Sequence, residues 1–174
     1  MISKILAVWT RVEMILIGCL IFAALTCFLG GALIRVFAPG HAVDWAEEVS
    51  LYCIIWATMF SGSVLVAERR HIATEVVINA LGRSRQVTLG WFVTALTIVF
   101  CIAMLIFGWQ AFDFALLLDE RSGSTLRAPQ GWAVFLALPV GMALILGRIA
   151  LMLVQGLRPF GADLGPVQAG EKEI

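Results

Sequence analysis

Residues 14–34 read MILIGCLIFAALTCFLGGALI, a run of 21 residues without a charged side chain. Three more uncharged runs follow at Val49–Ala67, Gln86–Phe112 and Ala128–Gly147, with lengths of 19, 27 and 20 residues. An α-helix needs about 20 apolar residues to cross the hydrocarbon core of a bilayer. The runs therefore predict an all-α integral membrane protein with four transmembrane helices.

Composition supports the same class. The chain is 61% hydrophobic and only 14% charged, too few charges to cover a soluble domain of 174 residues. The first run is longer than the apolar part of a cleaved signal peptide, so we expect a retained span. All cysteines lie inside apolar runs without a CxxC pair, which argues against a disulfide framework or a zinc site.

Basic residues indicate how the helices are oriented. With four crossings, both termini and the central loop share one side, which carries nine basic residues: Lys4, Arg11, Arg69, Arg70, Arg83, Arg85, Arg148, Arg158 and Lys172. The opposite side carries only Arg35, Arg121 and Arg127. Because loops rich in Lys and Arg stay in the cytoplasm, we expect both termini there.

Span limits follow from the apolar periodicity and the helix-stop signals. We expect a transmembrane domain over 1–158, with spans at about 14–36, 46–67, 87–112 extending to 118, and 130–155. The third helix is about 50 Å long, so it should tilt or project past the membrane. Pro139 should kink the fourth.

Two further segments complete this organisation. Apolar residues on one helical face predict a short amphipathic helix at about 72–81 on the cytoplasmic surface. Residues 159–174 are rich in Gly, Pro and polar residues, which predicts a flexible cytoplasmic tail.

The second span has the most distinctive local pattern. Asp44 and Glu47 have capping-box spacing, so the helix should begin at Asp44. Glu47 and Glu48 either favour the positive end of the helix dipole or meet basic residues of a partner. A small-residue surface follows, which packs either within this chain or against a second membrane protein; its members are Ala57, Ser61, Gly62, Ser63 and Ala67.

The whole stretch resembles a known family. Glu47-Glu48, then Trp56, then Ser61-Gly62-Ser63, then Arg69-Arg70-His71-Ile72 resemble the small membrane subunit, DctQ type, of tripartite ATP-independent periplasmic (TRAP) transporters. The likeness is best over Val43–Ile72, and four spans extend it over nearly the whole chain. That family often continues with a basic residue, a β-branched residue and Asp. Here Ala73-Thr74-Glu75 keeps the carboxylate without the basic residue, so we assign no fixed ion-pair partner.

The resemblance implies a scaffold subunit in the bacterial inner membrane, without a cofactor of its own. Its expected partners are membrane lipids, a large multi-span subunit that holds the sodium and substrate sites, and a periplasmic protein that delivers a carboxylate. No nucleic-acid partner is expected.

Three groups of residues are candidates for these contacts. The large subunit is expected to bind Ala57, Ser61, Gly62, Ser63, Ala67, Glu47 and Glu48. The periplasmic protein is expected to dock at Asp113, Asp119, Glu120, Arg121 and Arg127, although Asp113 also reads simply as a solvated interfacial residue. Lipid and topology anchors on the cytoplasmic side are Arg69, Arg70, His71, Arg83 and Arg85.

Three other interpretations remain open. A self-sufficient homodimeric transporter would want a carboxylate at membrane depth, and Glu13, which borders the first span, is the nearest one. A membrane anchor of a redox enzyme would need axial ligands, yet His41 and His71 fall on opposite sides of the membrane. An assembly factor or enzyme anchor without a transport role is the third. Enzyme chemistry in this chain itself is not expected, because no set of catalytic residues comes together.

Overall fold

The computed structural model describes residues 2–41, 43–67 and 83–154. Four helices in this part are long and apolar enough to cross a membrane, which confirms the predicted all-α class with four apolar helices. They are α1 (Ile2–Phe37), α2 (Trp45–Ala67), α4 (Arg83–Leu117) and α5 (Ala137–Val154), the last preceded by the short helix η2 (Gly131–Phe135). The predicted surface helix at 72–81 and the tail at 159–174 lie outside the described residues.

The first helix is longer than its uncharged run. α1 begins at Ile2, not near residue 14, because the amphipathic lead continues the same helix. Its 36 residues extend about 54 Å at 1.5 Å per residue, against about 30 Å of hydrocarbon. α4 has 35 residues, so both helices are overlong, whereas the sequence indicated this only for the third span.

A short connection joins α1 to α2. The backbone N–H of Ala38 still donates to Ile34 at 2.8 Å, and the single turn η1 (Pro39–His41) follows. Pro39 cannot donate an intrahelical hydrogen bond, and its ring disfavours the helical conformation of the residue before it, so it ends α1. α2 then begins at Trp45, directly after Asp44.

α4 ends in a Schellman motif. The N–H of Glu120 donates to the carbonyl of Ala115 at 3.1 Å, and the N–H of Asp119 donates to Leu116 at 3.2 Å. Asp119 takes the left-handed position with φ 48°, a place usually held by Gly that Asp tolerates better than most residues.

The loop between α4 and α5, residues 118–130, closes on itself. Ser122 N–H donates to Ala128 at 2.9 Å, and Gln130 N–H donates to Glu120 at 2.9 Å. An isolated antiparallel bridge between Arg121 and Pro129 lies between these bonds. The two ends of the loop are therefore held side by side, and its tip at 122–127 is presented as a compact unit.

The fourth span is irregular before α5, whose first turn holds Pro139, and the predicted kink at Pro139 stays a prediction. η2 is a π-helical turn, in which the N–H of Leu136 donates to Gly131 at 2.9 Å. Pro139 has no N–H to donate to the preceding turn, so the regular hydrogen-bond ladder is interrupted at this point. The indole N–H of Trp56 on α2 donates to the carbonyl of Ala133 at 2.9 Å and so ties this turn to α2.

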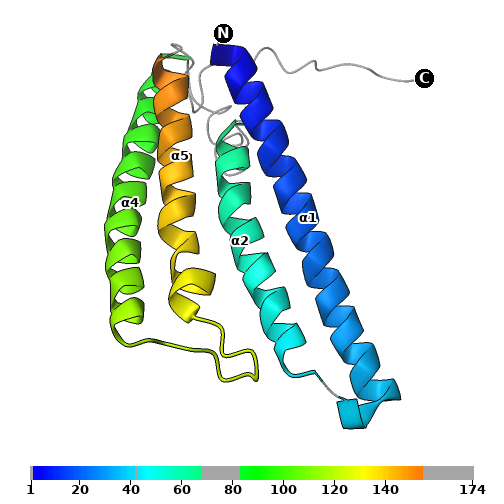
Figure 1. Ribbon diagram of the computed structural model, residues 1–174. Coiled ribbons are helices and arrows are strands. Elements are labelled where there is room, and N and C mark those ends of the chain that lie inside the picture. The colour runs from blue at the N-terminus through cyan, green and yellow to red at the C-terminus, as the bar shows by residue number, and fades with distance from the viewer. Residues whose placement is uncertain (1, 42, 68–82, 155–174) are drawn as a thin grey trace, which may run out of the picture.

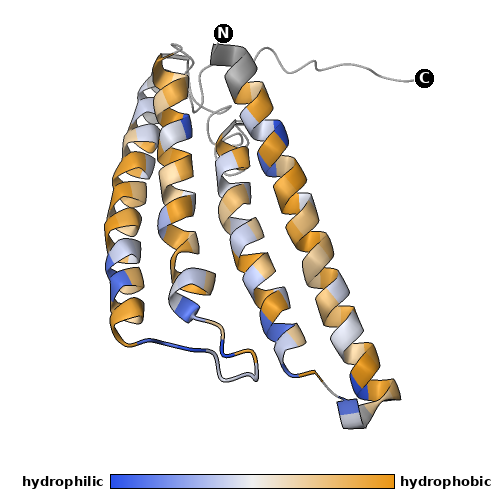
Figure 2. Ribbon diagram, viewed as in Figure 1, coloured by the Kyte–Doolittle hydropathy of each residue, from blue (hydrophilic) through white to orange (hydrophobic). Residues whose placement is uncertain are grey.

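The helices lie side by side in a single row rather than in a compact square. Figure 1 shows the order α4, α5, α2, α1, and the main interhelical contacts join neighbours in this row. We call the end that holds the start of α1 and the end of α5 the terminal end, and the opposite end the hairpin end. Apolar residues cover most of each helix, and polar residues gather toward the two ends (Figure 2).

All four helices meet at the terminal end. Here α1 extends past the end of α2 and leans toward α5 (Figure 1). The buried core of this region comprises Val66, Ile149 and Met152, packed against side chains from every helix: Leu6, Val93, Ile98, Ile145 and Leu153.

Candidate functional site

A buried ion pair joins α1 to α5 at the terminal end. A terminal nitrogen of Arg148 lies 2.7 Å from a carboxylate oxygen of Glu13. The Arg148 side chain is fully buried, and that of Glu13 is only 6% exposed. Charged side chains inside a membrane protein are costly unless they are paired, so each of these residues offsets the charge of the other.

Two neighbours on α1 complete this cluster. Arg148 Nη1 donates to the hydroxyl of Thr10 at 2.9 Å, and Trp9 Nε1 donates to the second carboxylate oxygen of Glu13 at 2.6 Å. The guanidinium carbon lies 5.3 Å from the centre of the Trp9 ring, within cation–π range. Trp9, Thr10, Glu13 and Arg148 together are called the Glu13–Arg148 cluster below.

The sequence did not reveal this pairing. It presented Arg148 as one of the cytoplasmic basic residues and Glu13 as a lone carboxylate bordering the first span. One signal was available: Glu13 directly precedes the first uncharged run, and Arg148 directly follows the last. Because α1 starts and α5 ends at the same end of the row, these positions come to a similar depth.

A second polar cluster lies at the hairpin end, between the α4–α5 loop and the start of α2. The carboxylate of Asp44 accepts the backbone N–H of Thr125 at 2.9 Å and its hydroxyl at 2.5 Å. These two hydrogen bonds, the hydroxyl first, lower the pKa of Asp44 below its ordinary value of 3.8. The expected capping residue of α2 therefore also holds a loop that lies far away in sequence.

Glu48 extends this cluster by one helical turn. Its carboxylate accepts hydrogen bonds from the hydroxyls of Ser124 and Tyr52. Ser122, itself buried, supports Ser124 through a bond of 3.0 Å to its backbone N–H. Asp44, Glu48, Ser124 and Thr125 are called the loop anchor below.

Other charged residues at the hairpin end remain accessible. Glu47 pairs with Arg35 at 2.8 Å, and both side chains are more than half exposed. Arg121 donates to Asp119 at 3.0 Å, and this bond lowers the pKa of the Asp119 carboxyl. The predicted docking residues here are all at least partly exposed: Asp113, Asp119, Glu120, Arg121 and Arg127.

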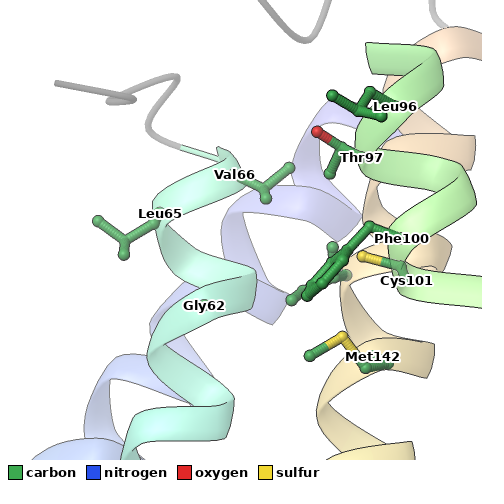
Figure 3. A pocket seen from close by; sticks show the side chains of 9 residues that line it. Gly62, Leu65, Val66, Leu96, Thr97, Phe100, Cys101 and Met142 are labelled. Carbon is green, nitrogen blue, oxygen red and sulfur yellow. The ribbon is translucent and has the colours of Figure 1, made fainter. Parts of the chain in front are cut away.

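An apolar groove of about 510 Å³ opens between α2 and α4 (Figure 3). Helix α5 lies between these two helices and contributes Met142 and Ile145. The rest of the lining comes from α2 and α4: Gly62, Leu65, Val66, Leu96, Thr97, Phe100 and Cys101. The Thr97 hydroxyl already donates to its own helix at 2.9 Å, so the groove fits an apolar occupant.

Comparison with known families decides the identity. Residues 25–159, most of the chain, match the family model described as tripartite ATP-independent periplasmic transporters, DctQ component. The chain belongs to the DctQ family. The resemblance predicted from the second span is thereby confirmed, and this DctQ chain is a non-enzymatic, multi-pass membrane component of a tripartite transporter. Searches of curated proteins and of solved structures gave no match.

The structure divides the small-residue surface of this DctQ component. Ala57 is 4% exposed and Ser63 is fully buried, so both are enclosed by helices of the same chain. Gly62 faces Ile145 of α5 and also lines the groove. Ser61 is partly exposed and donates to Thr58 on its own helix at 2.7 Å. The side chain of Ala67 lies outside the described part.

The predicted cytoplasmic anchors fall where the structure gives no side-chain detail. Arg69, Arg70 and His71 lie outside the described residues. Arg83 and Arg85 belong to the first turn of α4, but their side chains are also outside the described part. Their role as lipid anchors therefore stays a prediction.

Proposed function

We propose that this DctQ component is the scaffold subunit of a sodium-coupled transporter that imports organic acids, chiefly carboxylates. It binds and anchors a large multi-span transport subunit in the bacterial inner membrane. Its hairpin end helps to dock a periplasmic substrate-binding protein. Both termini face the cytoplasm, in line with the distribution of basic residues.

The family match supports the three-part system, and the charge distribution supports a non-transporting role. Substrate and ion pathways usually place ionisable residues against a cavity at membrane depth. Among the described residues, the two buried charges, Glu13 and Arg148, neutralise each other. The apolar groove offers no charge to a carboxylate. We therefore assign the substrate and sodium sites to the large subunit.

The groove is the surface that we assign to the large subunit. It combines an open apolar hollow with the close-approach residue Gly62, and both suit a transmembrane helix of a partner. Ser61 and Glu47, from the predicted interface, remain accessible for the same contact.

Reconstitution tests the overall proposal. Liposomes that hold this chain, the large subunit and the binding protein should take up a labelled carboxylate only under an inward sodium gradient. Leaving out this chain should abolish uptake. Uptake by this chain alone would contradict the scaffold role and favour a self-sufficient transporter.

A glycine pair tests the assigned surface. Gly62→Leu puts a bulky side chain into the groove, whereas Gly18→Leu adds the same group on α1, where a Cβ meets nothing within 4 Å. We expect the first change to weaken association with the large subunit about tenfold, equivalent to about 1.4 kcal/mol. Co-purification at matched expression measures this. Equal loss in both variants would argue against the groove as the interface.

Charge reversal tests the docking of the binding protein. Arg121→Glu and Arg127→Glu reverse exposed positive charges at the hairpin end. Because rim charges act mainly on association rates, we expect slower, less salt-sensitive binding of the periplasmic protein with little change in its dissociation rate. Surface plasmon resonance on nanodisc-held transporter measures both rates. An unchanged association rate in both variants would place the docking surface elsewhere.

A further inference from the structure

The chain is built as two helical hairpins. α1 and α2 form the first, and Gly31 lets them approach so closely that an added Cβ would lie 2.7 Å from that of Ala46. α4 and α5 form the second, where Gly108 lies against Leu138 and Pro139. Each hairpin therefore has a tight internal contact that holds its two helices together.

The α2–α5 seam joins the hairpins along most of their length, and the loop anchor joins them at the hairpin end. α2 packs against α5, with Gly141 close to Met59 and Gly62 close to Ile145. One line of contact between two bodies permits them to rotate about that line. The angle between the hairpins must then be fixed by contacts away from the seam.

α1 offers few such contacts. Among its described side chains only Glu13, Ala24 and Gly31 are buried, and their spacings of 11 and 7 residues place them on one narrow stripe. The rest of α1 carries exposed apolar residues that suit lipid as well as protein. In a bilayer such surfaces give no net drive toward helix association, so small and polar contacts decide the packing.

We infer that the Glu13–Arg148 cluster is a latch that fixes the angle between the two hairpins and so sets the width of the groove between α2 and α4. Glu13 belongs to the first hairpin and Arg148 to the second, so their contact joins α1 to α5 and lies outside the α2–α5 seam. One wall of the groove is α2, from the first hairpin, and the other is α4, from the second (Figure 3).

Within the described residues, Arg148 has no carboxylate near it other than Glu13. Every other described carboxylate lies at or near the hairpin end, far along the helices from Arg148: Asp44, Glu47, Glu48, Asp113, Asp119 and Glu120. If the hairpins rotated apart, each charge would lose the opposite charge that pairs with it. Thr10 accepts a hydrogen bond from Arg148, and Trp9 donates one to Glu13. These two bonds restrict the ion pair to one geometry.

Distance measurements on the full chain in nanodiscs test this. Spin labels at Leu65 on α2 and Leu96 on α4, both exposed, report the width of the groove. Labels at Phe92 on α4 and Val154 on α5 report a distance within one hairpin. All variants share a background without the native cysteines: Cys19, Cys27, Cys53 and Cys101.

In Arg148→Met and Glu13→Gln we expect the Leu65–Leu96 distance to shift and its distribution to broaden by about 2 Å, as when packed helices slide. The Phe92–Val154 distance should not change. The double variant should be no broader than Arg148→Met, because both changes break one contact.

A milder variant covers the case in which Arg148→Met does not fold. Trp9→Phe keeps a ring beside Arg148 and removes only the N–H that holds Glu13, so a smaller broadening is expected. Unchanged distributions in Glu13→Gln and Trp9→Phe would overturn the latch, as would additive broadening in the double variant. The chain is measured alone, so this result is separate from that of the transport test.

Discussion

The two ends of the row are both held by polar contacts between segments far apart in sequence, yet the contacts differ in kind. At the terminal end, a full ion pair is buried between α1 and α5, and Arg148 is inaccessible. At the hairpin end, the carboxylates of Asp44 and Glu48 hold a loop through hydroxyl and backbone donors. Asp44 there is exposed to solvent.

The difference reflects what surrounds each contact when it opens. Water can replace the donors that the loop gives to Asp44, so the loop anchor can open at low cost. Opening the Glu13–Arg148 pair leaves two buried charges unpaired, so that contact opens only at a high cost in free energy. We therefore expect the terminal end to be the rigid end and the hairpin end to be the adaptable one.

The largest effect should come from breaking the buried pair on one side. Arg148→Met leaves the Glu13 carboxylate buried without a cation and should destabilise the fold by about 3–5 kcal/mol. The matched control is Arg35→Gln, which breaks the exposed pair with Glu47 and should cost at most about 1 kcal/mol. Unfolding by steric trapping in bicelles measures both. Equal losses of unfolding free energy in Arg148→Met and Arg35→Gln would contradict the contrast between the two ends.

The next largest change in stability is expected at the adjacent glycines Gly30 and Gly31. Gly31→Ala brings a Cβ to 2.7 Å from that of Ala46, whereas Gly30→Ala adds one in open space. Because Gly31→Ala overpacks the contact, it should lower the free energy of unfolding by about 1–3 kcal/mol. Gly30→Ala should be neutral or stabilising by up to about 1 kcal/mol. Thermal unfolding in detergent compares the two, and a neutral Gly31→Ala would show that α1 and α2 can separate freely at this end.

A smaller effect is expected from the loop anchor. Thr125→Val removes the hydroxyl bond to Asp44 and should change global stability by no more than about 0.5 kcal/mol, as at other surface sites. Hydrogen exchange should nevertheless become faster in residues 119–130 and stay unchanged in α5. A global loss as large as that of Arg148→Met would mean that the loop anchor is not the adaptable contact.

The smallest effect concerns pH. The pKa of Asp44 is lowered by Thr125 and that of Asp119 by Arg121. A carboxyl whose pKa is lower in the folded state than in the unfolded state stabilises the folded loop at pH values above 3.8, its ordinary pKa. This contribution is lost as the pH falls through the lowered pKa. Carbon-13 titration of the two carboxyls should give values below 3.8. Thr125→Val should return Asp44 toward 3.8 and leave Asp119 unchanged.

The sequence allowed the helices to be predicted but not the contacts between them. Uncharged runs indicate where α2, α4 and α5 lie, because a bilayer selects helix length directly. The predicted start of the fourth span near residue 130 falls at η2, and α5 itself begins at Ala137. The start of α1 was placed too late, since charges such as Arg11 and Glu13 interrupt the apolar run but not the helix.

The contacts depend on tertiary arrangement. Glu13 and Arg148 are 135 positions apart, and only the side-by-side order of the helices brings them together. Glu48 was expected to act on the helix dipole or on a partner, and its bonds to the α4–α5 loop could not be foreseen because the fold of that loop depends on Asp119 in a left-handed conformation. Ala57 and Ser63 have the composition of a partner surface, yet they are buried inside this chain.

The arrangement in a single row has a consequence for the surrounding lipid. A square bundle buries the inward side of every helix, whereas a row such as that in Figure 1 leaves two broad faces that annular phospholipid can contact. A partner seated on the groove face displaces lipid from that face and leaves the opposite one immersed. In the proposed complex, lipid would contact this chain on the face opposite the groove and not on the groove face.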